Sequence, residues 1–150
     1  FETGGDILTP ENREKYKQLK IMDITQWLKE VVLPRIKVIR PKNRILLHPT
    51  CSCQIMGLTP VLLDIARKCA REVILPDNWG CCGASGDRGF IFPELSDSAT
   101  RDERDEIGHE SFDGCYSLAR TCEIAMQDHI EQPYESIVYL VDETIQDQGT

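Results

Sequence analysis

The residues best suited to chemistry in this sequence are two adjacent cysteines in a glycine-rich loop. Cys81 and Cys82 lie within Asn78–Phe90, which also carries four glycines and the charged pair Asp87 and Arg88. Neighbouring side chains of a strand point to opposite faces, so adjacent cysteines can serve one site only outside regular β structure. Glycine permits positive φ angles and lets backbone N–H groups turn toward an anionic guest, such as a thiolate-ligated cluster or a phosphate. The loop therefore indicates a ligand site, and the competing interpretation is two small buried hydrophobic residues in a tight turn.

The elements around this loop predict where a second pair of cysteines lies. The apolar run Ile45–His48 predicts a buried strand that leads to Cys51 and Cys53, and the run Val73–Pro76 predicts a second strand that leads to the Cys81 loop. Thr59 and Pro60 predict the start of a helix between them. Strand, helix and strand form a βαβ unit, and ligands bind beyond the carboxyl ends of its strands. Cys51 and Cys81 are therefore expected to be neighbours in space.

The last cysteine of interest lies near a predicted helix start. Ile124, Ala125, Met126 and Ile130 indicate a helix that begins close to Cys122. The positive potential at a helix N-terminus favours a thiolate. Cys69, by contrast, lies on the apolar face of the helix that begins at Thr59, and we assign it to packing.

The remaining elements are predicted from caps, prolines and apolar spacing. The first is a peripheral helix from Pro10, capped by Thr9, with Tyr16 and Leu19 facing inward, and the second is a helix capped by Asp23 and ended by Pro34, with Trp27 in the core. An extended segment Phe90–Leu95 precedes a helix Ala99–Ile107, whose solvated face carries Asp102, Glu103, Asp105 and Glu106. A turn region follows at Ser111–Thr121, and the alternating run in Ser136–Ile145 fits either a strand or a helix, of which we favour the helix.

Length and composition set the class. The chain has 150 residues, 41% of them hydrophobic and 28% charged, which predicts one globular domain. We expect an α/β fold, a small parallel-sheet sandwich with helices on both faces and the cysteine loops at the carboxyl edge. The formal net charge of −8 argues against nucleic acid as a partner. No apolar run approaches the roughly 20 residues that span a bilayer, so no transmembrane segment is expected.

Seven cysteines and the first residue bear on the cellular context. The cysteine count is odd, and it favours metal or redox chemistry in a reducing, cytoplasmic setting over a secreted disulfide scaffold. The chain opens at Phe1, and we expect a piece of a longer protein, with residues 1–9 as a linker remnant and residues 10–150 as the domain.

Four separated motifs resemble the cysteine-rich CCG domain, which occurs in heterodisulfide reductase and in the iron–sulfur subunits of glycolate oxidase. The closer similarity is to the C-terminal part of FAD- and iron–sulfur-containing D-lactate dehydrogenases. It covers the chain from about Leu8 to the end. The motifs that carry it are His48-Pro-Thr-Cys51-Ser52, Cys82-Gly83-x-x-Gly86-Asp87-Arg88-Gly89-Phe90, Pro93-Glu94-Leu95 and Arg120-Thr121-Cys122-Glu123.

The resemblance implies an iron–sulfur domain, with a 4Fe-4S cluster as the expected cofactor. It gives Cys51, Cys81, Cys82 and Cys122 as cluster ligands. Ala119 stands where the family often has a further cysteine, and Cys53 and Cys115 lie outside its pattern. These two cysteines, together with His48, Gly83, Asp87 and Arg88, are candidates for the surroundings of the cluster. Arg88 either closes the loop by pairing with Asp87 or faces the cluster and raises its potential.

The same resemblance implies a larger assembly. An upstream FAD domain would oxidise a D-2-hydroxy acid, and electrons would leave through iron–sulfur centres to a quinone or cytochrome. Contact with such an acceptor would make the protein peripheral to the inner membrane. The chain itself has no dinucleotide fingerprint and no Cys-x-x-Cys-x-x-Cys run. The flavin and any ferredoxin-like clusters are therefore expected upstream, and this part alone is expected to be inactive.

Two alternatives remain open from the residues. A structural zinc module would use four thiolates, although Cys51 with Cys53 and Cys81 with Cys82 are spaced more tightly than the usual zinc pairs. A thiol–disulfide switch between Cys81 and Cys82 would form a strained ring that is easily reduced.

Overall fold

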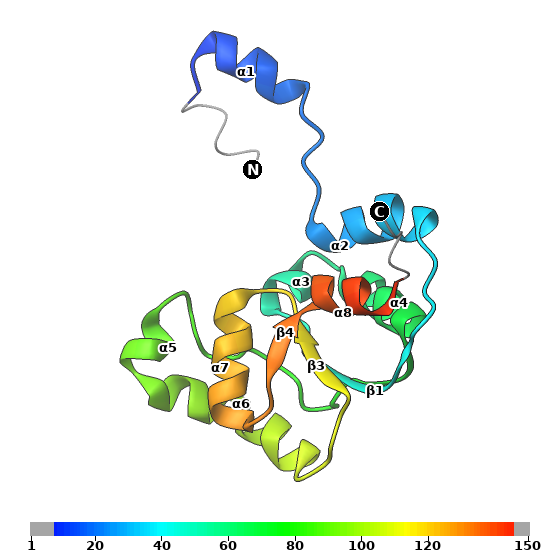
Figure 1. Ribbon diagram of the computed structural model, residues 1–150. Coiled ribbons are helices and arrows are strands. Elements are labelled where there is room, and N and C mark those ends of the chain that lie inside the picture. The colour runs from blue at the N-terminus through cyan, green and yellow to red at the C-terminus, as the bar shows by residue number, and fades with distance from the viewer. Residues whose placement is uncertain (1–7, 146–150) are drawn as a thin grey trace.

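Four parallel strands form the sheet at the centre of the structure, in the order β2-β1-β3-β4 (Figure 1). This computed structural model describes residues 8–145. The strands are β1 (Lys42–Leu47), β2 (Ala70–Ile74), β3 (Gly114–Ser117) and β4 (Tyr134–Ser136). Leu46 is opposite Ile74 on one side and Cys115 on the other, so β1 is paired along both edges. This explains why Ile45, Leu46 and Leu47 are all fully buried: a parallel strand covered on both faces is a continuous apolar run.

Helices connect the strands and cover both faces of the sheet. They are α1 (Pro10–Lys17), α2 (Ile24–Trp27), the π-helical η2 (Leu28–Val32), the 3-10 turn η3 (Leu33–Arg35), α3 (Cys51–Ile55), α4 (Thr59–Cys69), α5 (Arg88–Ile91), α6 (Pro93–Ile107), α7 (Arg120–Ile130) and α8 (Ile137–Thr144). One core packs α4, α8 and η2 against Ile45, Leu47 and Tyr116. The second packs α6 and α7 against Leu46, Cys115 and Tyr134. The predicted α/β class, with a parallel sheet between helical layers, is confirmed.

The chain reverses its direction across the sheet between β1 and β3. After β1 it runs through α3 and α4 to β2 at one edge, and after β3 it runs through α7 to β4 at the other edge. The connections that leave β1 and β3 therefore diverge to opposite faces. Such a switch point opens a crevice beyond the carboxyl ends of the two strands, where α/β proteins bind ligands.

The N-terminal helix stands apart from the rest of the domain. Figure 1 shows α1 away from the sheet, and α1 contains no buried residue. Thr9 caps it as predicted, but Leu19, expected to face inward, is exposed, and Tyr16 is only partly buried. Residues 1–7 of the expected linker lie outside the described residues. We also predicted Trp27 in the core, yet it is exposed while Leu28 is buried, because the helix widens to π geometry at Leu28 and turns its apolar face.

Three further predictions from local pattern are wrong. Phe90–Leu95 is not extended, because α5 and the start of α6 occupy it. Ser111–Thr121 is not only turn, since it contains β3, an inner strand of the sheet. Glu103 is not solvated: its exposed fraction is 1%. The helices beginning after Asp23 and Ser136 and near Cys122 are confirmed. Among residues 8–145, no helix combines the length and apolar character that crossing a bilayer requires.

Candidate cysteine site

The end of β1 carries the first part of the site. Thr50 caps α3, since its Oγ1 accepts a hydrogen bond from the N–H of Cys53 at 3.2 Å. Cys51 is the first residue of α3 and is exposed, whereas Cys53 is buried. Burial raises the pKa of Cys53, and the Oγ1 of Thr59 lies 4.0 Å from its Sγ. Of these two cysteines, Cys51 is the one that faces outward at the carboxyl edge.

The glycine-rich loop after β2 presents its two cysteines differently. Cys81 is exposed, and Cys82 is buried. Between them and α6, Gly83 has a φ of +74°, and a Cβ at this position would lie 2.6 Å from the carbonyl oxygen of Leu95 and 2.7 Å from Cα of Ser96. Only glycine allows the loop to approach the backbone of α6 this closely. The irregular backbone thus permits adjacent cysteines to serve one site.

The first turn of α7 supplies the third part of the site. Cys122 is the third residue of α7 and is buried. Its thiol lies 3.0 Å from that of Cys82, measured between the two Sγ atoms. The residue before α7, Ala119, provides no side-chain cap, and Cys122 lies in the first turn, where the potential of the helix is positive. Residues 40 positions apart in the sequence therefore meet where β2 and β3 end.

Electrostatic coupling shows that all four thiols share one neighbourhood. The pKa of Cys82 is lowered to about 6, chiefly by its hydrogen bond with the Cys122 thiol. The pKa of Cys122 is raised, first by that same bond and then by burial and by the charges of Cys82, Cys51 and Cys81. The Gly83 N–H, 3.4 Å from Sγ of Cys81, lowers the pKa of Cys81, but burial and the thiols of Cys82 and Cys51 outweigh it. We call Cys51, Cys81, Cys82 and Cys122 the cysteine site.

A buried histidine and glutamate lie beside the cysteine site. His48 directly follows β1, and Nδ1 of its ring lies 2.9 Å and 3.1 Å from the two carboxylate oxygens of Glu103 in α6. The side chains are 1% and 2% exposed. His48 contributes to lowering the pKa of Cys82, after the larger effects of Cys122, burial and the Ala84 N–H. Glu103 was predicted to face solvent. Its position four residues before the apolar Ile107, and so on the same face of the helix, is the sequence feature that indicates its burial.

The other candidate residues lie outside the site. Cys115 is buried within β3, and its pKa is raised to about 12 by burial. Cys69 is fully buried in the other core, as its assignment to packing requires. Asp87 and Arg88 are both exposed, and among residues 8–145 no ion pair joins them. The loop-closing ion pair, one of the two roles considered for Arg88, is therefore absent from the described structure.

The arrangement of donors bears on which metal could be held. Among the described residues, no three His, Cys, Asp or Glu side chains are arranged to hold a single metal ion. The 3.0 Å between the sulfurs of Cys82 and Cys122 is shorter than the roughly 3.8 Å that tetrahedral zinc, with Zn–S bonds near 2.3 Å, imposes, and two thiolates that bind different irons of a cluster lie farther apart still. Either metal group would therefore require these two side chains to move apart. A multi-iron cluster instead takes four thiolates from separate loops and places iron and sulfide between them. In donor type and number the cysteine site fits such a cluster.

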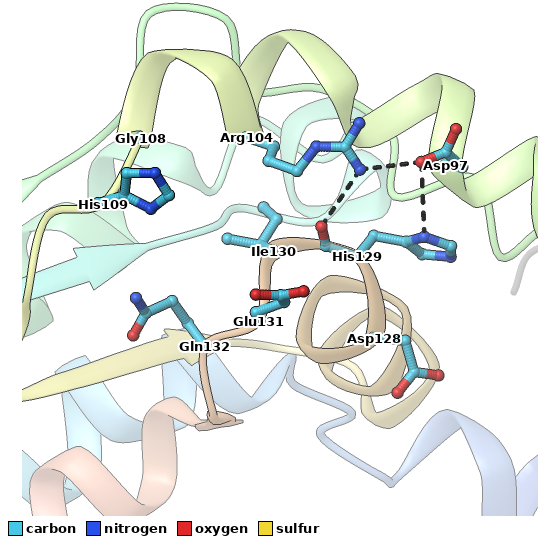
Figure 2. Close-up of a pocket in the computed structure, with 9 residues that line it drawn as sticks. All are labelled: Asp97, Arg104, Gly108, His109, Asp128, His129, Ile130, Glu131 and Gln132. Carbon is cyan, nitrogen blue, oxygen red and sulfur yellow. Dashed lines mark hydrogen bonds and ion pairs between the residues drawn. The ribbon is translucent and has the colours of Figure 1, made fainter.

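A separate pocket lies away from the cysteine site. It has a volume of about 580 Å³ and is lined by α6 and the end of α7, including Asp97, Arg104 and His129 (Figure 2). There, Arg104 Nη1 donates to Asp97 at 2.9 Å and to the His129 carbonyl at 3.3 Å. These charges satisfy one another, and the pocket shares no residue with the cysteine site.

Comparison of the chain with protein-family models, with curated proteins and with solved structures found no match.

Proposed function

We propose that this domain holds an iron–sulfur cluster through Cys51, Cys81, Cys82 and Cys122. The observation that carries the proposal is the convergence of four thiols from three strand ends at the switch point of the sheet. Cys82 and Cys122 pack in one core, but packing does not account for Cys51 and Cys81, which are exposed and contribute little to either core. Two exposed thiols gathered beside a buried pair are best explained by a shared ligand.

Each surrounding residue has a definite part in this proposal. A bound cluster would accept and release single electrons. Gly83 brings the loop against α6 and directs its N–H at the sulfur of Cys81. The burial of Cys82 and Cys122 excludes water from one side of the site, while Cys51 and Cys81 leave the other side open to a partner. Hydrogen bonds and limited solvent access are the means by which proteins set cluster potentials.

We further propose that the domain works within a larger oxidoreductase, as its resemblance to CCG domains implies. In that arrangement, upstream FAD and ferredoxin-like domains pass electrons from a D-2-hydroxy acid such as D-lactate, and the acceptor is a quinone or cytochrome. The exposed side of the cysteine site supports this role, because electron transfer needs a close approach of the two centres. The domain alone would then bind iron without oxidising the hydroxy acid.

Anaerobic reconstitution tests the proposal. The protein is incubated with iron, sulfide and reductant, desalted, and measured for bound iron, bound sulfide and visible absorption. We expect both elements in the native protein and at least a severalfold loss in C51S, C81S, C82S and C122S. The matched control is C69S, whose thiol is also buried but packs in the other core. Iron binding that survives C122S, or that needs Cys69, would contradict the proposed ligand set.

A second candidate function is favoured by one distance. The sulfurs of Cys82 and Cys122 lie 3.0 Å apart, a separation from which a disulfide could form. The candidate thiol–disulfide pair is therefore Cys82 with Cys122, in place of the Cys81–Cys82 pair considered from the sequence. Oxidation by a small disulfide would join the two sulfurs, with loss of two electrons and two protons, and release two small thiols. Peptide mapping after treatment with oxidised glutathione tests it: a Cys82–Cys122 crosslink that forms and reverses supports this function, and none forms if the thiols serve only as ligands.

A further inference from the structure

The buried pair of His48 and Glu103 has a composition that packing does not explain. Glu103 is the only acid of α6 that is buried, and its partner ring is equally enclosed. Burying a carboxylate and an imidazole is costly even when they are hydrogen-bonded, and a well-packed apolar pair would often serve stability equally well. The buried pair therefore indicates a role beyond packing.

One nitrogen of the ring is left without a partner. Nδ1 faces the Glu103 carboxylate, whose oxygens accept its hydrogen, whereas Nε2 is buried and has no hydrogen-bond partner among the described residues. Buried polar atoms are nearly always paired, and an exception calls for an explanation such as a missing ligand. The unpaired Nε2 thus points to a group that the protein chain does not itself supply.

The backbone fixes this ring where β1 ends. The N–H of His48 donates to the carbonyl of Tyr116 at 2.9 Å, and its carbonyl accepts from Oγ of Ser117 at the same distance. The ring of Tyr134 meets the imidazole edge-on, with the centroids 6.5 Å apart. His48 stands three residues before Cys51 and acts electrostatically on Cys82. The imidazole therefore borders the cysteine site and has little freedom to turn away.

We propose that Nε2 of His48 donates a hydrogen bond to a sulfur of the cluster held by the cysteine site, and that Glu103 keeps the imidazole oriented for this purpose. The inference rests on the proposed iron–sulfur function and adds the pair that tunes it. A hydrogen-bond donor beside cluster sulfurs stabilises the reduced, more negative state. His48 thereby raises the reduction potential through its contact with the cluster, and Glu103 is a positioning residue, because it acts through His48.

Redox titration of the reconstituted protein and its variants tests this role. H48Q removes the imidazole, and E103Q removes the carboxylate while keeping an acceptor for Nδ1. We expect both variants to retain iron and to have lower midpoint potentials. In H48Q the equilibrium constant for reduction of the cluster should fall roughly tenfold, which lowers the midpoint potential by 59 mV for one electron.

The matched control H109Q alters an exposed histidine and should leave the potential unchanged. An unchanged potential in H48Q overturns the inference. A raised potential in E103Q overturns the part of Glu103, since loss of a nearby negative charge alone would act in that direction.

A measurement on the native protein covers the case in which H48Q or E103Q does not fold. Pulsed EPR of the reduced cluster, in protein labelled with 15N-histidine, should detect one coupled nitrogen that persists in H109Q and H129Q. A spectrum without coupled histidine nitrogen overturns the inference. If the native protein takes up no iron at all, the proposed function itself fails, and that result is distinct from a cluster that forms without contact to histidine.

Discussion

At the scale of single residues, close approach and burial decide the behaviour of the cysteine site. Gly83 allows the loop to lie against α6, and Cys82, the residue before it, meets Cys122. Burial alone does not separate the thiols of the site from the others, because Cys82 and Cys122 are buried as well. The two exposed thiols, Cys51 and Cys81, belong to the site, while Cys69 and Cys115 are enclosed in the cores.

The first prediction compares two glycines of the same loop. Gly83 and Gly86 have similar φ angles, +74° and +78°, but a Cβ added at Gly86 would meet no atom within 4 Å, whereas one added at Gly83 would meet backbone at 2.6 Å. G86A should cost about 1 kcal/mol of unfolding free energy from backbone strain. G83A adds a clash with α6 and should cost about 3 kcal/mol or more. Urea denaturation of both variants measures the difference, and equal losses would mean that the close approach to α6 is unimportant.

The second prediction concerns thiol reactivity. Burial raises the pKa of Cys115 to about 12, so at pH 8 only about one molecule in ten thousand carries its thiolate. We expect iodoacetamide to label the exposed Cys51 rapidly in the folded, metal-free protein and to leave Cys115 unmodified until denaturant is added. Raising the pH increases the thiolate fraction of Cys115 but does not open the core. Peptide mapping that finds Cys115 labelled as fast as Cys51 would place β3 outside a stable core.

At the scale of elements, α6 holds together the parts that form the site. Its buried face carries Glu103 to His48 and lies against Gly83 of the loop. Its outer side also fixes the turn that leads into the loop, because Glu106 accepts the N–H groups of Asp77 at 2.7 Å and Asn78 at 2.8 Å. One helix therefore positions both the end of β1 and the cysteine loop after β2.

The third prediction follows from this turn. The hydrogen bonds from Asn78 and Asp77 lower the pKa of Glu106 from its usual 4.5, so the carboxylate form favours the folded state. The resulting stability is present above the unfolded pKa and is lost as pH falls through the lower folded pKa. E106Q should cost a few tenths to about 1 kcal/mol at pH 7, since the group is exposed to solvent. Denaturation of native protein and E106Q should converge at acid pH.

The control for this variant is D102N, which changes an exposed acid of the same helix. D102N should leave the unfolding free energy within about 0.5 kcal/mol of the native value. If D102N and E106Q behave alike, the effect comes from the net charge of α6 and not from the two hydrogen bonds.

At the scale of the whole molecule, stability resides in the sheet and its two helical layers. The core on one face includes Leu62 and Ile65 of α4, and the core on the other face includes Met126 of α7. The N-terminal helix contributes no buried residue to either. The cysteine site stands at the carboxyl edge of this scaffold, whose cores are apolar and need no metal to form.

The fourth prediction tests that division. A chain that begins at Lys20, and so lacks α1, should unfold within about 0.5 kcal/mol of the native protein. L62A removes buried atoms from the core and should cost about 2 to 5 kcal/mol. Both are measured in metal-free protein by urea denaturation. A large loss on removing α1 would mean that this helix packs on the domain in solution.

The sequence by itself determined the caps, strands and helix starts, which depend only on residues close to one another in the chain. The caps at Thr9 and Asp23, the strand at Ile45–Leu47 and the helix starting near Cys122 could all be predicted, because capping and apolar runs act within a few residues. The placement of two cysteine loops at one sheet edge followed from the same elements. The cysteines of the candidate site were named from their motifs.

The tertiary structure alone decided contacts between distant residues. His48 and Glu103 are 55 positions apart, and Cys82 and Cys122 are 40 apart. From local pattern, Glu103 was indistinguishable from the other acids of a charged helix. The segment that forms β3 was predicted as part of a turn, because a strand of four residues has little sequence signal of its own and is stabilised by pairing with β1 and β4. Which acid is buried, which thiols meet and which nitrogen is left unpaired depend on how helices pack on the sheet, and that packing is cooperative and long-range.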